Sequence, residues 1–189
     1  MQIDRALNLV IPIERDGAAL YVHSKPISSQ VYDTYWRVLA RTFADINAQG
    51  LGAMGPRIAA KMLREVADEM GIWRDDPATK RVGVERGLMA EIHRLTNVLV
   101  AGNRGWDMVP VDDALKDGHI DEEDLGEVDG ILVFFTAASH LFRRANRAEM
   151  LQGSLGLWGA QIESSDCTEF LKSLTISTDA GSTGGNAAA

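Results

Sequence analysis

Residues 7–13, Leu-Asn-Leu-Val-Ile-Pro-Ile, and residues 19–23, Ala-Leu-Tyr-Val-His, are apolar runs that flank the dipeptide Asp16-Gly17. An Asp-Gly pair between two such runs is typical of a β-hairpin with a tight turn. The segment that follows has the apolar spacing of helices and carries no recognisable catalytic equipment. The opening of the chain therefore predicts a β-hairpin within residues 1–26, followed by a mostly helical domain.

Apolar residues recur at helical spacing in three stretches, which predict helices over residues 28–50, 56–71 and 85–100. Ser28 or Ser29 can cap the first helix, and Gly71 is placed to end the second. Between the second and third helices, the charged residues 73–84 are expected to form an exposed loop.

The second half of the chain predicts a short helix over residues 113–116, closed by Gly118. Asp121 is then expected to cap the most apolar helix, which should be the central one because it carries apolar residues on several sides. Residues 149–162 could form a last helix, which its glycines weaken.

These elements indicate a mainly α fold class, an N-terminal β-hairpin followed by a multi-helix bundle. We expect one domain over residues 1–174, because a chain of this size can bury a substantial core. Residues 175–189 are rich in Ser, Thr, Gly and Ala and have too few apolar side chains to offset the entropy of ordering. They are expected to form a flexible, disordered tail.

The chain has 19 basic and 27 acidic residues, a net charge of −8 and a pI near 5.0. This charge disfavours nucleic acid and anionic lipid as partners. The longest apolar stretch, residues 131–138, is far shorter than the roughly 20 residues that a membrane span needs. The N-terminus lacks a secretory signal pattern, and the single Cys167 cannot form an intramolecular disulfide, so a cytoplasmic location is expected.

Two stretches have the outline of ligand-binding motifs. Residues 50–55 match the G-x-G-x-x-G string of dinucleotide sites, but they follow a predicted helix where that motif requires a strand, so an interhelical turn is favoured. Residues 113–124 place acidic residues at several positions of a calcium loop, but Leu115 stands at the third position and the shorter Asp124 at the twelfth. A short helix, a glycine turn and a helix cap are favoured there.

Other chemically capable residues lack the neighbours that catalysis or metal binding needs. The four histidines have no sequence spacing typical of metal ligands, and Cys167 lies beside Asp166 and Glu169, which would raise the pKa of its thiol. No serine lies in a nucleophile elbow. We therefore predict no catalytic residue, no cofactor and no metal.

The four tryptophans, Trp36, Trp73, Trp106 and Trp158, lie on different predicted elements. A tryptophan at the end of an element either fills the core or anchors a partner. We favour core packing for each of them, and Trp158, among glycines, is the best candidate for an interface.

Three parts of the chain carry a family resemblance: residues 8–14 (NLVIPIE) with 20–24 (LYVHS), residues 87–98 (GLMAEIHRLTNV), and residues 157–162 (LWGAQI) with 167–170 (CTEF). They resemble tail assembly chaperones and related tail proteins of tailed bacteriophages, over most of the chain up to about residue 170. The likeness is one of whole segments and includes no diagnostic motif.

The resemblance implies a non-enzymatic chaperone of tail morphogenesis. Such a protein would keep the phage tape measure protein soluble, recruit tail tube protein subunits to it in the host cytoplasm, and be absent from the mature virion. The alternative is a structural tail, terminator or head–tail connector subunit that stays in the virion. A predominance of helix favours the chaperone, because tube-forming proteins continue sheets from one subunit to the next. A small enzyme is a third, less favoured reading.

The resemblance brings no residue-level motif for partner binding. Exposed apolar and aromatic positions near the glycine-rich stretch are the best candidates. We therefore predict partner contacts at Leu155, Trp158 and Phe170. The sequence does not decide the oligomeric state, and a homo-oligomer is one of the alternatives.

Overall fold

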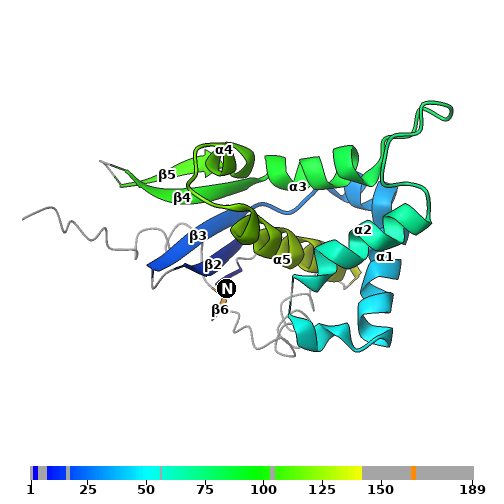
Figure 1. The fold of residues 1–189 in the computed structure, drawn as a ribbon, viewed down its shortest axis with the longest axis horizontal. Coiled ribbons are helices and arrows are strands. Elements are labelled where there is room, and N and C mark those ends of the chain that lie inside the picture. The colour runs from blue at the N-terminus through cyan, green and yellow to red at the C-terminus, as the bar shows by residue number, and fades with distance from the viewer. Residues whose placement is uncertain are drawn as a thin grey trace, which may run out of the picture.

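The computed structural model describes residues 2–3, 8–15, 18–55, 57–102, 105–141 and 163–164. This part of the chain forms an α+β fold, in which helices pack against one sheet that is antiparallel except for a short parallel pair of strands at one edge (Figure 1). The strands are β1 (Gln2–Ile3), β2 (Leu9–Arg15), β3 (Ala18–Ser24), β4 (Thr96–Gly102), β5 (Gly105–Pro110) and β6 (Glu163–Ser164). The helices are α1 (Ser29–Ala48), η1 (Leu51–Met54), α2 (Ile58–Glu69), η2 (Glu85–Met89), α3 (Ala90–Arg94), α4 (Val111–Lys116) and α5 (Glu122–Leu141).

The predicted N-terminal hairpin is confirmed by the pairing of β2 with β3. The two strands are antiparallel, and Arg15 pairs with Ala18, so only residues 16 and 17 connect them. A two-residue connection is the length that a tight hairpin turn needs. The connecting residues themselves lie outside the described part of the chain.

The sheet runs in the order β5-β4-β3-β2-β1-β6, with β5 at one edge. Pairing aligns Ile11, Val22, Val98 and Val109 in one row across four strands. Because successive side chains of a strand point to opposite faces, this row lies on a single face. Its members belong to the core or pack against it, so this is the face that the helices cover.

Helix α1 begins where its sequence predicts. The Ser28 hydroxyl accepts a hydrogen bond from the backbone amide of Val31 at 3.3 Å, which caps the helix. The helix ends at Ala48, and Gly50 follows with a φ of 66°. A positive φ suits glycine, so the predicted end of this helix is confirmed.

The G-x-G-x-x-G string forms a turn between helices, as favoured from the sequence. Residues 51–54 form η1 between α1 and α2, so the element directly before them is a helix and not a strand. Helix α2 then ends at Glu69, with Gly71 at a φ of 62° and the Ile72 amide bonded to the Ala67 carbonyl at 2.9 Å. This arrangement is a Schellman motif, which confirms the predicted role of Gly71.

The prediction of a helix over residues 85–100 is wrong in its second half. Helical structure ends at Arg94, and residues 96–102 form β4, which pairs with β3 and β5. The Ser24 and Thr96 hydroxyls are 2.8 Å apart where β3 and β4 meet. The fold therefore contains a second hairpin, β4–β5, and is richer in strand than the mainly α prediction.

The loop over residues 73–84 is only partly exposed. Asp76 pairs with Arg81 in an isolated bridge, and the returning residues lie against residues 72–73 through hydrogen bonds from the Val84 and Glu85 amides. Val84 is fully buried, which corrects the prediction that the whole loop is exposed. In Figure 1 this loop projects from the end of α2 before the chain enters α3.

Helix α5 is the central helix, as its apolar character predicts. Residues 130–139 are all buried, and α5 contacts α1, α2 and β2. The ring of Phe134 lies 5.6 Å from that of Phe43 on α1, and His140 stacks on Tyr32 at 4.2 Å. A helix that is apolar on all sides has to be enclosed in this way.

The start of α5 is fixed by a reciprocal cap. The Asp121 carboxylate accepts hydrogen bonds from the amides of Glu123 and Asp124, each at 2.9 Å, and the Asp121 amide donates to the Asp124 carboxylate at 3.0 Å. This confirms the predicted short helix, turn and cap over residues 113–124, with Gly118 at a φ of 75°.

Replacing Asp121 by Ala is expected to reduce the free energy of unfolding by about 0.5–2 kcal/mol, because two amides of α5 lose their acceptor. Urea denaturation followed by circular dichroism measures the change. The control is Asp121→Ser, which retains a capping oxygen and should cost much less. Equal losses in both variants would show that the cap does not stabilise the fold.

Several predictions fall outside the described residues. They are the last helix over residues 149–162, the tail over residues 175–189 and the boundary of the domain at residue 174. These stay predictions.

Candidate functional site

A surface groove of about 560 Å³ lies between α2 and α5. We call it the α2–α5 groove. Its apolar lining comes from Ala60 on α2, Trp73 in the following loop, Met89 at the end of η2 and the backbone of Gly126 on α5. An apolar lining is what a protein needs in order to hold an apolar side chain of another molecule.

The two walls of the α2–α5 groove carry opposite charge. The α2 side contributes three basic residues and the α5 side three acidic ones: Arg57, Lys61 and Arg64, and Glu122, Glu123 and Asp129. The basic residues follow one another at intervals of four and three residues, the spacing that places side chains on one face of a helix. The groove is therefore apolar at its base and electrically polarised across its width.

Ion pairs hold the walls in place. The Arg57 guanidinium donates to Glu123 and to Glu127, at 3.0 Å in each case, and so connects the start of α2 to α5. These hydrogen bonds raise the pKa of Arg57 above its ordinary value, and the bond to Glu123 has the largest effect. Arg64 pairs with Asp68 at 2.6 Å while its guanidinium lies 4.3 Å from the centre of the Trp73 ring.

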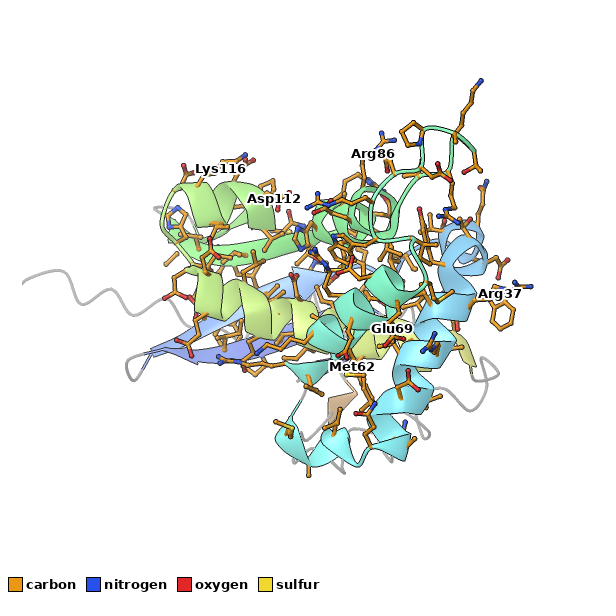
Figure 2. All side chains as sticks on the ribbon, turned by 45° about the vertical axis from the view of Figure 1, so that its right-hand side comes forward. Arg37, Met62, Glu69, Arg86, Asp112 and Lys116 are labelled. Carbon is orange, nitrogen blue, oxygen red and sulfur yellow. The ribbon has the colours of Figure 1, made fainter. Side chains whose placement is uncertain are left out.

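A histidine links three helices beside the groove. His93 on α3 contacts Asp112 on α4 through Nδ1 at 2.9 Å and Asp129 on α5 through Nε2 at 2.7 Å. The side chains of His93 and Asp129 are 17% and 19% exposed, so water screens this pair less than it screens a surface pair. Asp112 lies on the outer side of α4, near Lys116 (Figure 2).

The two carboxylates favour the charged form of His93. Burial lowers the pKa of His93, but hydrogen bonds and charge from Asp129 and Asp112 outweigh it, and the net result is a pKa above the ordinary 6.5. With both ring nitrogens bonded to carboxylates, the imidazole has no nitrogen left to exchange a proton with a substrate. The arrangement suits a cross-link between helices.

The residues predicted to contact a partner, Leu155, Trp158 and Phe170, lie outside the described part of the chain. Cys167 lies there as well. Of the other three tryptophans, Trp36 is 49% exposed on α1, so the prediction that it fills the core is wrong. Trp73 is partly buried and packs against the core, and Trp106 is half-buried and meets Tyr21 edge-on.

Within the described ranges, no group of His, Cys, Asp and Glu side chains is arranged to hold a metal ion. In the stretch that resembles a calcium loop, Asp113 pairs with Lys116 at 3.0 Å and Asp121 caps α5. The helices of the described residues include none with the length and apolar content of a membrane span.

Comparison with protein-family models, with curated proteins and with solved structures finds no match to this chain.

Proposed function

We propose that this chain is a tail assembly chaperone of a tailed bacteriophage, which binds the tape measure protein and recruits tail tube subunits without catalysing a reaction. The observation that carries the proposal is the α2–α5 groove, which offers Trp73, Met89 and Ala60 to an apolar segment of another protein. The net charge of −8 supports it, because charge of one sign keeps a chaperone soluble at high concentration.

A structural tail or connector subunit is the second candidate, and one observation favours it. The chain forms two hairpins in one sheet, with β5 at an edge, whereas the sequence predicted a single hairpin. An edge strand can pair with a strand of a neighbouring subunit, which is how sheets continue between subunits. Mass spectrometry of purified virions separates the candidates, since a chaperone is expected to be absent and a structural subunit to be present in fixed proportion.

Co-expression with the tape measure protein of the same phage tests the chaperone directly. We expect the tagged chain to retain the tape measure protein in soluble form through affinity purification. In Gly126→Leu the new side chain occupies the groove, and we expect capture to fall by at least about tenfold, the equivalent of roughly 1.4 kcal/mol.

The matched control is Gly126→Ala. A Cβ at Gly126 meets no atom within 4 Å, so Ala fits without strain and leaves most of the groove open. Full capture of the tape measure protein by Gly126→Leu would show that the partner binds elsewhere on the chain. Failure of the wild-type chain to retain any tape measure protein would overturn the proposed function.

A further inference from the structure

The charges of the α2–α5 groove are not all paired with one another. Arg57 is held by Glu123 and Glu127, Arg64 by Asp68, and Asp129 by His93. Two wall residues remain: in the part of the chain that the structure describes, Lys61 on α2 and Glu122 on α5 take part in no ion pair. Both are exposed, so they present one positive and one negative charge on opposite sides of an apolar base.

The walls indicate what kind of backbone fits between them. Both are helices, and the nearest strands belong to the sheet and do not line the groove. An extended segment placed there would find no strand edge to satisfy its amides and carbonyls, whereas a helix satisfies its own. From Arg57 to Arg64 the α2 wall extends by seven residues, which is about 10 Å at the rise of an α-helix, or about two turns of an occupant.

We infer that the α2–α5 groove binds an amphipathic helix of a partner protein, with its apolar stripe on Trp73, an acidic residue toward Lys61 and a basic residue toward Glu122. The inference deepens the proposed function, because it names the chemistry of the segment that the partner supplies. Since opposite charges lie on opposite walls, they also set the direction in which the partner helix runs. A helix with charges of a single sign on both sides would meet a like charge on one wall.

Binding of synthetic peptides to the full chain tests the inference without any phage protein. Three dye-labelled helical peptides share one apolar stripe, and it is flanked by Glu on one side and Lys on the other, by Glu on both sides, or by Lys on both sides. Fluorescence anisotropy gives the dissociation constant of each. The mixed peptide is expected to bind tightest to the wild-type chain, by up to about fivefold for each mismatched charge, because exposed ion pairs have modest energies.

Charge reversal in the groove should exchange these preferences. Lys61→Glu makes both of the unpaired wall charges negative, so the peptide with Lys on both sides should become the preferred one. Glu122→Lys should favour the peptide with Glu on both sides. The double variant again carries opposite unpaired charges on the two walls and should again prefer the mixed peptide. General loss of folding cannot produce this pattern.

The control is Arg37→Glu, which changes the net charge as Lys61→Glu does but lies on α1, outside the lining of the groove (Figure 2). It should retain the wild-type order of peptides. The inference is overturned if all three peptides bind alike, or if Lys61→Glu and Arg37→Glu have the same effect. Capture of the tape measure protein is measured separately from peptide binding. The inference can therefore fail while the proposed function stands, and the proposed function can fail while the inference stands.

Discussion

Replacing Gly83 by Ala is expected to lower the free energy of unfolding by about 1–3 kcal/mol. A Cβ at this position would lie 2.4 Å from the Trp73 carbonyl oxygen and 2.4 Å from the carbonyl carbon of Arg74. Both atoms are backbone, so no side chain can rotate away to make room. Urea denaturation followed by circular dichroism measures the loss.

The bonds around Gly83 explain why the backbone cannot shift at little cost. The Gly83 amide donates to the Asp75 carboxylate at 2.8 Å, and this bond is the main cause of the lowered pKa of Asp75. The Gly83 carbonyl accepts from the Tyr35 hydroxyl at 3.3 Å, which ties the loop to α1. A movement that relieves the clash would break or lengthen these bonds.

Gly126→Ala is the matched control for this prediction, because it makes the same change where there is space for a Cβ. There the helix should gain about 0.5–1 kcal/mol, since alanine restricts the unfolded chain more than glycine does. The two variants should therefore move the denaturation midpoint in opposite directions. An unchanged midpoint for Gly83→Ala would show that the loop does not pack as the structure describes.

Replacing Asp129 by Asn is expected to cost about 1.5–3 kcal/mol near neutral pH and below, because His93 loses its closest charged partner in a half-buried setting. The pH dependence is the sharper readout. The pKa of His93 in the folded chain is above the ordinary 6.5, so the folded state binds a proton more tightly than the unfolded state does. The stabilisation is complete below pH 6.5 and is lost as the pH rises through the raised pKa.

Denaturation midpoints of the wild type and of Asp129→Asn, measured at a series of pH values from below 6.5 upward, test this prediction. The difference between the two proteins should be largest at the acidic end and should shrink with rising pH. Asp113→Asn is the control, because it breaks the exposed pair with Lys116 and leaves His93 unchanged. A difference that does not vary with pH would mean that Asp129 does not raise the pKa of His93.

Local patterns were sufficient for the elements whose boundaries have local causes. Two apolar runs around Asp16-Gly17 predicted the β2–β3 hairpin, and Ser28 and Asp121 predicted the starts of α1 and α5. The caps bond residues two or three positions apart, and the hairpin pairs two strands that are consecutive in the chain. Such bonds can be read from a sequence without knowledge of the tertiary fold.

The β4–β5 hairpin could not be predicted in the same way. The apolar spacing of the preceding helix continues into residues 96–100, so the local pattern is ambiguous between helix and strand. The choice of strand over helix is decided by the pairing of Val98 with Val22 on β3 and with Val109 on β5. The first of these contacts joins residues far apart in the chain, and it favours the strand only once the first hairpin is in place.

The groove and the histidine cross-link were missed because distant parts of the chain build them. Lys61 and Glu122 come from separate helices, and His93 meets Asp129 across 36 positions of the sequence. Each residue is unremarkable alone: a charged side chain on a helix usually faces water. No spacing rule connects them, so the sequence contained no signal that would have singled them out.

The edge strand β5 has a further consequence. Asp107 is exposed in the middle of this strand, opposite Val100, and Pro110 at its end has no amide to donate. A charge and a proline on an edge oppose the addition of another strand, so these two residues weigh against the structural-subunit alternative, which needs β5 to pair with a neighbouring subunit. The proposed chaperone would gain from such an edge, because it could remain dispersed beside the aggregation-prone partner that it keeps soluble.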